Sequence, residues 1–356
     1  MRDLRRGSTM WLVLIVDRAR VALTRFTVPS VSGDGWTSDE HPIGFPATQL
    51  VPSWTARTPP GSWIEVELQA VTAGGRRTRW YVMGRWSEHG EPRTSVAGQG
   101  DGDGDVAVDT FVARQPVSAY RVRVRACGPG ARVEELAVLA SALPAPPPEG
   151  SPPSGLEPVE LDVPALWQHA HAGHHPEYDG GGANWCGPAA TAMVLAYWER
   201  GPEDLAWVGA GCPAPAVDHA ARGTYDSSYL GTGNWPFNVA YAGTYGLRGF
   251  VTRLRSAAEL ERLTAAGIPV VASLSFKERE LPGAGYSTSG NLIVVTGFTA
   301  GGDVRVNDPA APDGRVRRVY PRAAFEHVWL RSSGSGGIAY VLHPPELSLP
   351  ESDGNW

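Results

Sequence analysis

Lysine is almost absent from this chain of 356 residues, in which Lys277 is the only one. A Walker A motif needs a Gly-Lys-Ser/Thr string, and Lys277 stands in SFKERE, so a nucleotide motor of that class is excluded. Positive charge is carried by scattered arginines, and the formal net charge is −6. Nucleic-acid binding usually shows a clustered basic surface, and the sequence has none, so we expect no nucleic-acid partner.

Near the N-terminus the sequence also lacks a long apolar run. Seven apolar residues extend from Met10 to Val16, whereas a membrane span needs about 20. Asp17 and Arg18 follow where a signal peptide would have small residues. We therefore interpret this run as a buried first strand and predict a soluble chain without a membrane span. Whether it is cytoplasmic or secreted stays undetermined.

Cysteine is scarce as well, with only Cys127, Cys186 and Cys212. Three cysteines are too few for a disulfide scaffold and leave at least one thiol free. The number of cysteines therefore does not indicate whether the protein works in an oxidising or a reducing compartment.

A stretch rich in Pro, Gly and Ser, residues 143–158, divides the chain and reads as a linker. Before it, in 1–142, runs such as SWIEVELQAV and AYRVRVRAC have the composition of strands separated by turns, which predicts a β-sandwich accessory domain with a loose lead-in. After it, 159–345 mixes helical and strand periods, which predicts an α+β domain. Residues 346–356 are expected to form a tail. At this length, each domain is expected to have its own core.

The C-terminal half is predicted to place its helix first and its antiparallel sheet last. A helix is expected after Cys186, in AATAMVLAYWER, and a second in SAAELERLTA, ended by Gly267 and followed by a buried strand. Further on, NLIVVTGFT and GGDVRVND predict strands, RRVYPRAAFEHVWL predicts a helix and GGIAYVLH predicts the last strand.

Two features of the N-terminal half have a functional and a plain interpretation. The aspartates of DGDGD, 101–105, could converge on calcium, but an EF-hand would need a glutamate where Val112 stands, so a polar hairpin turn is favoured. Trp63, Trp80 and Trp86 could line a carbohydrate-binding face, although aromatic residues in strands usually belong to a core.

Cys186 lies between a glycine-rich loop and the predicted helix, in GGANWCGPAATAMVLAYW. A helix N-terminus stabilises a thiolate through its unpaired N–H groups. Proline at position 188 suits the first turn, because no needed donor is lost there. A buried cysteine can also be simple packing, but the Trp-Cys-Gly-Pro-Ala string favours a nucleophile position.

The string NWCGPAATAMVLAYW, with Gln168 upstream and GNLIVVTGFTAGGDVRVNDPA downstream, resembles the papain-like cysteine peptidases of the C39 type. The resemblance covers about residues 159–343 and is to the stand-alone, soluble actinobacterial branch. ATQLVPSWTARTPPGSWIEVEL and WYVMGRW also resemble the β-rich domain that precedes the peptidase domain there. The resemblance implies a papain-like fold and a hydrolase that acts on peptide or amide bonds.

The same resemblance implies residue roles. Cys186 matches the nucleophile, Gln168 the glutamine that helps to form the oxyanion hole, and Asp308 the residue that orients the catalytic histidine. That histidine should follow Gly290, but the sequence reads Gly290-Asn291-Leu292. An asparagine amide neither titrates near neutral pH nor forms an imidazolium, so it cannot serve as the base.

Three interpretations of the asparagine follow: a degenerate peptidase that binds peptide or glycopeptide, an active enzyme that recruits another histidine, and a chain whose histidine was replaced deliberately. The histidines available for rescue are His169, His171, His174 and His175, in QHAHAGHHPEYD. These four could also bind zinc, but their spacing matches no standard ligand pair. We interpret the segment as a solvated loop and predict neither metal nor cofactor.

The segment YDSSYLGTGNWPFNVAYAGTYG, 225–246, has aromatic residues and glycines that suit a peptide-binding groove, although core packing explains them nearly as well. Together with the residue before the nucleophile, it supplies the predicted substrate contacts: Trp185, Tyr229, Asn234 and Trp235. The sequence thus predicts a cysteine peptidase fold acting through Cys186, or alternatively an inactive relative that binds peptide.

Overall fold

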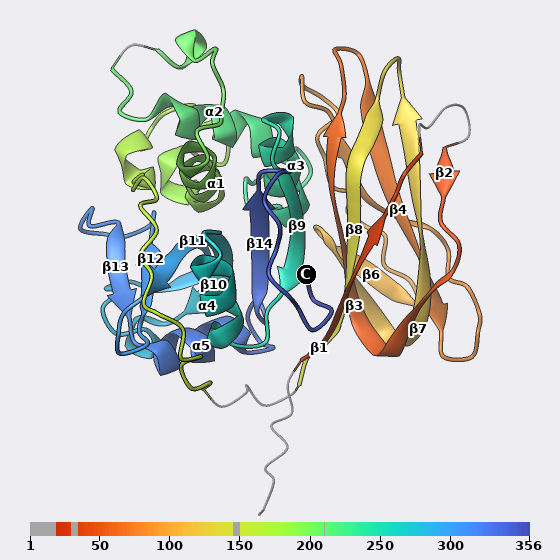
Figure 1. The fold of residues 1–356 in the computed structure, drawn as a ribbon. Coiled ribbons are helices and arrows are strands. Elements are labelled where there is room, and N and C mark those ends of the chain that lie inside the picture. The colour runs from red at the N-terminus through yellow and green to blue at the C-terminus, as the bar shows by residue number, and fades with distance from the viewer. Residues whose placement is uncertain (1–18, 30–34, 145–149, 210) are drawn as a thin grey trace, which may run out of the picture.

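The computed structural model describes residues 19–29, 35–144, 150–209 and 211–356. The apolar run from Met10 to Val16, interpreted above as a strand, lies outside these ranges. A β-rich N-terminal domain and a mixed C-terminal domain lie side by side (Figure 1). Within the described ranges, no helix has the length and apolar character needed to cross a membrane.

The β-rich N-terminal domain predicted from the sequence is confirmed. Its strands pair in the order β1-β8-β3-β7-β4-β5, and β2 and β6 both pair with β7. The long strand β3 pairs with β7 through its first part and with β8 through its second, which joins the strands into one folded sheet. The bounds are β1 Arg20–Phe26, β2 Trp36–Thr37, β3 His41–Arg57, β4 Trp63–Thr72, β5 Tyr81–Trp86, β6 Gly104–Ala107, β7 Thr110–Cys127 and β8 Arg132–Ala142.

Strand β4 shows how the alternating pattern builds this domain. Val66 and Leu68 are buried in the core. Glu67, between them in sequence, points to the other face and accepts two hydrogen bonds from the guanidinium of Arg123, at 2.5 and 2.6 Å. An apolar inner face and a paired polar outer face explain why this segment is a strand.

The DGDGD segment is not a hairpin turn as expected: its first three residues form a polar bend, and Gly104 and Asp105 begin strand β6. One carboxylate oxygen of Asp101 accepts the backbone N–H groups of Asp103 and Gly104, at 2.9 and 3.1 Å. The side chain of Asp101 also pairs with Arg79, and that of Asp103 with Arg76. These aspartates are therefore occupied by turn and arginine contacts.

The three tryptophans considered for carbohydrate binding do not form an exposed strip. Trp86 is 1% exposed and packs against Phe237 of the other domain. Trp63 and Trp80 are half-buried, and arginine side chains lie over both rings.

The C-terminal domain is built on an antiparallel sheet in the order β13-β12-β11-β10-β14-β9. Its strands are β9 Arg248–Arg253, β10 Val270–Phe276, β11 Thr288–Phe298, β12 Val304–Asn307, β13 Arg317–Tyr320 and β14 Ile338–His343. Its helices are α1 Cys186–Tyr197, α2 Pro215–Thr224, α3 Trp235–Thr244, α4 Ala257–Ala265 and α5 Arg322–Leu330, with short 3₁₀ turns η1 Gln168–His171, η2 Gly182–Asn184, η3 Ala206–Val208 and η4 Glu278–Glu280.

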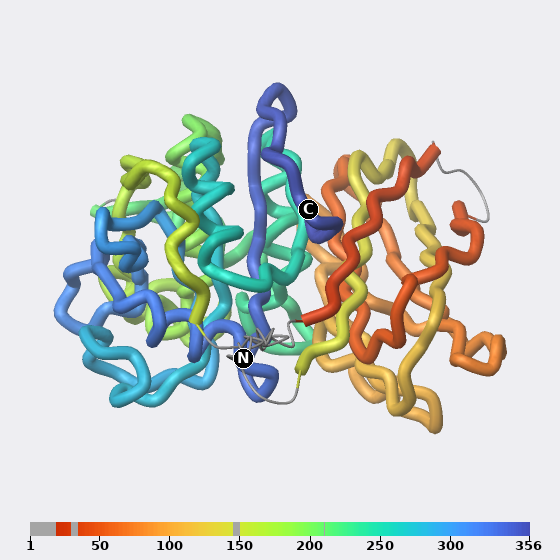
Figure 2. Tube along the Cα trace, turned by 60° about the horizontal axis from the view of Figure 1, so that its bottom comes forward, coloured from red at the N-terminus to blue at the C-terminus, as the bar shows by residue number. Residues whose placement is uncertain are grey.

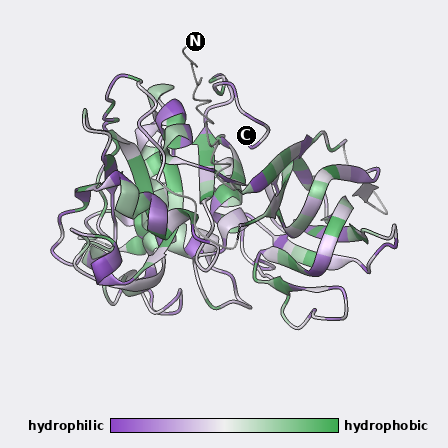
Figure 3. Ribbon diagram, turned by 90° about the horizontal axis from the view of Figure 1, so that it is seen from below, coloured by the Kyte–Doolittle hydropathy of each residue, from purple (hydrophilic) through white to green (hydrophobic). Residues whose placement is uncertain are grey.

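Helices cover both faces of this sheet, and its central strand β10 and the second half of β11 are mostly apolar (Figure 3). Along β11, Val294 belongs to the core that contains α1, α2 and α3, whereas Ile293 and Val295 belong to the core beneath α4 and α5. Successive residues of a strand point to opposite faces, so the apolar run predicted as a strand is buried on both sides.

Most of the predicted C-terminal elements are present, with one correction. The helix after Cys186 is α1, and Gly267, with φ of 79°, separates α4 from β10 as expected. RRVYPRAAFEHVWL, however, is not one helix: Arg317–Tyr320 forms β13, and α5 begins after Pro321. A residue before proline is disfavoured in helical conformation, and the preceding residues pair with β12 instead.

The expectation that each domain has its own core is wrong, because the division between the two buried clusters does not follow the domain boundary. One continuous core runs from the β-rich domain into α1, α2 and α3. Phe237 of α3 packs against Trp54 and Trp86, with ring centroids 6.2 and 5.4 Å apart. A Cβ at Gly84 would lie 2.9 Å from the Trp54 ring and 3.1 Å from the Phe237 ring, so this close approach requires glycine.

Polar contacts also cross the domain boundary. Asp109 accepts the backbone N–H of Trp235 at 2.9 Å, at the start of α3. Arg253 of β9 donates to the side chains of Ser141 and Gln49, at 3.1 and 2.5 Å. Asp109, Ser141 and Arg253 are buried, so the domains are held in one arrangement by directional contacts as well as by apolar packing.

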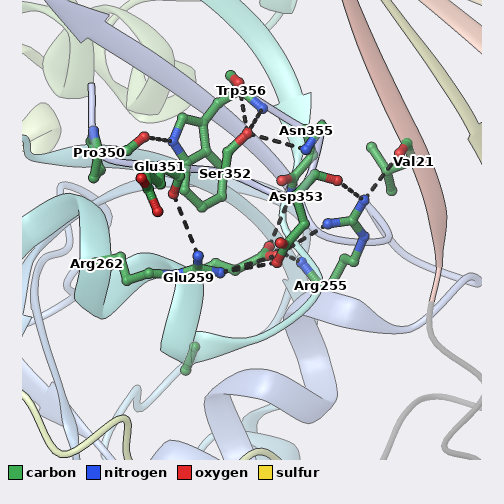
Figure 4. Close-up of polar contacts among 12 residues, drawn as sticks. Val21, Arg255, Glu259, Arg262, Pro350, Glu351, Ser352, Asp353, Asn355 and Trp356 are labelled. Carbon is green, nitrogen blue, oxygen red and sulfur yellow. Dashed lines mark hydrogen bonds and ion pairs between the residues drawn. The ribbon is translucent and has the colours of Figure 1, made fainter. Parts of the chain in front are cut away.

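The C-terminal segment lies between β1 and α4 (Figures 2 and 4). The carbonyl of Gly354 accepts the N–H of Leu23 at 2.8 Å. Asn355 donates to Glu259 at 2.9 Å, and Arg255 donates to the carbonyl of Asp353 at 3.1 Å. The residues expected to form a tail are thus packed against both domains.

The described part of the linker, from residue 150, is also fixed to the C-terminal domain. The backbone N–H and the hydroxyl of Ser151 both donate to the carboxylate of Glu326, at 2.5 Å each. Arg322 donates to the carbonyl of Ser151 at 2.7 Å. We propose 143–158 as the boundary between the domains.

The shared core predicts that the two domains unfold together. Phe237→Ala should cost about 3–5 kcal/mol, because it removes a buried ring, and should split the single calorimetric transition of the unmodified protein into two. Phe325→Ala removes an equally buried ring from the core beneath α5 and is the matched control, expected to lower Tm while the transition stays single. Indistinguishable traces for the two variants would contradict the shared-core account.

Candidate functional site

A cleft of about 890 Å³ lies where the two domains meet. The N-terminal domain contributes residues 107–110, and the C-terminal domain contributes residues 286–292 and several loops. Gln168, Cys186 and Asn291 all line this cleft. Three of the four predicted catalytic positions are therefore brought together at one surface.

Cys186 is the first residue of α1, which lies against β11. Burial raises the pKa of its thiol to about 11, and Asp179 and Asp308 add to the increase by electrostatic repulsion of a thiolate. Backbone N–H groups of Leu292 and Gly187 act in the opposite direction but do not overcome it. The helix N-terminus alone thus leaves the thiol protonated at neutral pH.

Asn291 occupies β11 directly before Leu292, and it is 2% exposed. Its Nδ2 group donates to the hydroxyl of Tyr286 at 2.7 Å and to Oδ1 of Asp308 at 3.1 Å. Its Oδ1 atom is buried without a hydrogen-bond partner. The amide thus makes with Asp308 the contact that a histidine at this position would make in a triad.

Asp308, the fourth predicted catalytic position, is fully buried and surrounded by donors. Its Oδ2 atom accepts the hydroxyls of Tyr286 and Tyr320, at 2.8 and 2.7 Å. Its Oδ1 atom accepts the N–H of Ala310 at 3.0 Å, in addition to the amide of Asn291. Burial, followed by repulsion from Asp308, raises the pKa of both tyrosines far above the ordinary value, so they remain neutral donors.

Gln168 begins η1 and is 3% exposed. Its Nε2 group donates to the carbonyl of Ala183 at 2.6 Å, in the loop that leads to Cys186. A side-chain amide carries two hydrogens, so one holds this loop in place and the second is the one that an oxyanion could use.

The four predicted substrate contacts fall into two groups. Tyr229, which is 49% exposed, and Trp235 line the cleft. Trp185 is fully buried and donates to the carbonyl of Tyr178 at 2.6 Å. Asn234 is buried too, and its side chain caps α3 by accepting the N–H of Phe237 at 3.2 Å. Segment 225–246 therefore serves both as groove lining and as core.

The four histidines near Gln168 have different surroundings. His169 lines the cleft, whereas His175 packs against the ring of Trp207. His171 and His174 both hydrogen-bond to Asp218, at 2.6 and 2.9 Å. Within the described ranges, no hydrogen bond joins any of the four to Cys186.

Sequence reasoning missed Asp109, Asp179 and Tyr286, which belong to the same site. Burial raises the pKa of Asp109 to about 6 and also raises the pKa of Asp179. No motif marks these positions, because they come from a turn of the other domain and from two separate loops.

The described ranges also contain one group of potential metal ligands: His171, His174, Cys212 and Asp218. Their ligand atoms all lie within 4.8 Å of one another. The sequence indicated the two histidines, but Cys212 and Asp218 lie about 40 residues further along the chain and carried no signal.

The pKa of Cys186 predicts an unreactive thiol. Alkylation by iodoacetamide, followed by peptide mapping so that each cysteine is counted separately, should stay slow at pH 6–8 and rise about tenfold per pH unit up to about pH 11, because the thiolate is the reactive form. A plateau of fast alkylation below pH 7 would show that an unrecognised cation stabilises the thiolate.

The chain is only weakly similar in overall structure to two solved structures. A protein from Bacillus anthracis described as a candidate C39-like peptidase is 19% identical, with 52% of this chain and 98% of that chain covered and a TM-score of 0.35. A structure of infectious bursal disease virus is 14% identical, with 35% and 33% covered and a TM-score of 0.20. No curated protein matches the chain.

Family models match both domains. Residues 31–141 match the peptidase C39 N-terminal domain of the actinobacterial type, and residues 160–336 match the Peptidase_C39-like family. The two matches cover the β-rich domain except β1, and the helices and sheet of the C-terminal domain except β14. The chain therefore belongs to the C39-like peptidase family.

Proposed function

We propose that this protein binds peptides in the cleft between its domains and hydrolyses them inefficiently or not at all. Its family and fold support a peptidase-type function. The observation that carries the proposal is the amide of Asn291, hydrogen-bonded to Asp308 where the imidazole of a triad would stand.

The first chemical reason is the state of the nucleophile. Peptide hydrolysis by a cysteine begins with a thiolate, and a pKa of about 11 for Cys186 leaves roughly one thiol in several thousand ionised at pH 7.5.

The second chemical reason is the leaving amine, which must be protonated as the C–N bond of the peptide breaks. The amide of Asn291 has no proton of suitable acidity to give.

The groups that would bind a peptide without reacting with it support the proposal. Tyr229 and Trp235 give the cleft exposed aromatic surface, and Gln168 and the N-terminus of α1 supply N–H donors. Such donors can hold a peptide carbonyl whether or not it is attacked. A role in peptide recognition therefore uses the whole site and needs no base.

The charge of the cleft favours basic peptides. Asp179 accepts hydrogen bonds from the neutral groups of Thr232 and Asn184, and it forms no ion pair among the described residues. Arg253, which also lines the cleft, is 3% exposed and directs its guanidinium to neutral acceptors such as Ser141 and Gln49. A lysine or arginine of a bound peptide would thus find an unpaired carboxylate near Cys186.

A second candidate function is slow hydrolysis with His169 as the base. The observation that favours it is the position of His169 in the lining of the same cleft, next to Gln168. It would require a movement of His169, because no hydrogen bond joins this ring to the thiol among the described residues.

Preference for basic peptides is tested by fluorescence anisotropy with two pools of labelled decapeptides. The pools are identical except that the charged positions are Lys or Arg in one pool and Asp or Glu in the other. In a Cys186→Ala background the basic pool should bind more tightly, and Asp179→Asn should weaken it about 2- to 5-fold, as expected for a partly solvated ion pair. Asp39→Asn, at an exposed position of the N-terminal domain, should have no effect. Tighter binding of the acidic pool would contradict this charge assignment.

The role of Asn291 is tested by Asn291→His. The imidazole would face Asp308 and should both lower the pKa of Cys186 and raise cleavage of a quenched-fluorescence peptide library by at least about 100-fold. Asn291→Gln keeps an amide and should gain nothing, and Cys186→Ala should abolish the gain. If the unmodified chain already cleaves at the rate of the histidine variant and His169→Ala removes that activity, the second candidate function is correct.

A further inference from the structure

Four side chains from three segments converge at a point outside the cleft. His171 and His174 lie in the loop that leads to Cys186, Cys212 lies in the loop before α2, and Asp218 lies on α2. The Nδ1 atoms of both histidines and the sulfur of Cys212 each contact the carboxylate of Asp218, at 2.6, 2.9 and 3.0 Å. The cluster unites a loop and a helix that are distant in sequence.

The geometry points to a structural zinc site formed by His171, His174, Cys212 and Asp218. Two nitrogens, one sulfur and one carboxylate oxygen are a four-ligand set that suits tetrahedral zinc. Bond lengths of about 2.0–2.3 Å place two ligand atoms of one zinc ion roughly 3.3–3.7 Å apart. Sγ of Cys212 and Nδ1 of His171 are already 3.6 Å apart, and the imidazole–carboxylate contacts would open by about 0.5–1 Å.

The orientation of the buried groups supports a metal in this place. His171 is fully buried, and its ring nitrogen Nδ1 is directed to the cluster, where it contacts the carboxylate of Asp218. Asp218 is fully buried too, and no arginine or lysine pairs with it among the described residues. Buried carboxylates are normally paired with a cation or coordinate a metal.

The summed charge of the four ligands also favours zinc at this position. On zinc binding the Cys212 thiol would lose its proton to solvent, and each Nδ1 would bind in the unprotonated form, with the ring proton on Nε2. One Zn²⁺, one thiolate, one carboxylate and two neutral imidazoles sum to zero charge. A neutral centre can be buried without the penalty of an isolated ion.

The site would stabilise the segment that shapes the cleft. Gln168 precedes His171 by three residues in the same 3₁₀ turn. A Cβ at Gly182 would lie 2.3 Å from the carbonyl oxygen of Gln168, so this turn packs tightly on the residues before Cys186. With all four positions filled by protein, the metal would hold the turn to α2 and leave no open position for substrate.

The proposal is tested on the full chain by metal analysis and cobalt spectroscopy in a Cys186→Ala background, which removes the cleft thiol. We expect one zinc per chain, a thiolate-to-cobalt charge-transfer band with Co²⁺, and a Tm that falls when a chelator removes the metal. Cys212→Ser should lose the band, and both Cys212→Ser and His174→Ala should weaken zinc binding by at least about 100-fold, since even outer-shell changes cost 10- to 100-fold. His169→Ala and His175→Ala, matched controls outside the cluster, should keep full affinity.

Three results would overturn the zinc assignment: no zinc bound after addition of stoichiometric ZnCl₂, a cobalt spectrum without the thiolate band, or equal loss of affinity in the His169→Ala control. If Cys212→Ser does not fold, zinc binding is measured on Asp218→Asn and His174→Ala instead. Circular dichroism checks that each of these variants is folded, and a loss of zinc affinity in them supports the site. These readouts do not depend on peptide binding or cleavage, so they stand apart from the proposed function.

Discussion

The packing of Phe237 between Trp54 and Trp86 is the contact on which the functional surface depends. It joins α3 to the β-rich domain and makes the two domains share one core. Because of this junction, the turn at residues 107–110 forms one wall of a cleft whose other walls carry Cys186 and Asn291. The N-terminal domain is therefore a part of the site and not only an attachment to it.

Within the cleft, an asparagine at position 291 in place of a histidine explains the proposed binding of peptides with little or no hydrolysis. Asp308 is satisfied by two tyrosine hydroxyls, a backbone N–H and the amide of Asn291, all of them neutral donors. Desolvation raises the pKa of the Cys186 thiol, which lies beside β11 at the cleft, to about 11. We therefore propose that the site keeps hydrogen-bond donors suited to holding a peptide and lacks, at position 291, the imidazole that would transfer protons.

The sequence alone predicted the family, the division into a β-rich and a mixed domain, and the helix that begins at Cys186, because local patterns and one motif encode them. It did not predict that Trp86 would pack against Phe237 of the other domain, or that Tyr286 would bind Asp308, because such contacts join residues whose spacing carries no pattern. The strand Arg317–Tyr320 was mistaken for helix because its pairing with β12 overrode the helical composition of the run. His171 and His174 were noticed as possible ligands, but their partners Cys212 and Asp218 became visible only when α2 was placed beside the loop.

The most direct test of the account is to follow binding and cleavage of the same peptide by the unmodified protein. A basic decapeptide that binds the cleft would be incubated with the protein in excess, and its intact mass followed over hours at pH 7.5. The account predicts a bound peptide that remains uncleaved, and no acyl adduct on Cys186. Rapid cleavage under these single-turnover conditions, lost in Cys186→Ala, would contradict it.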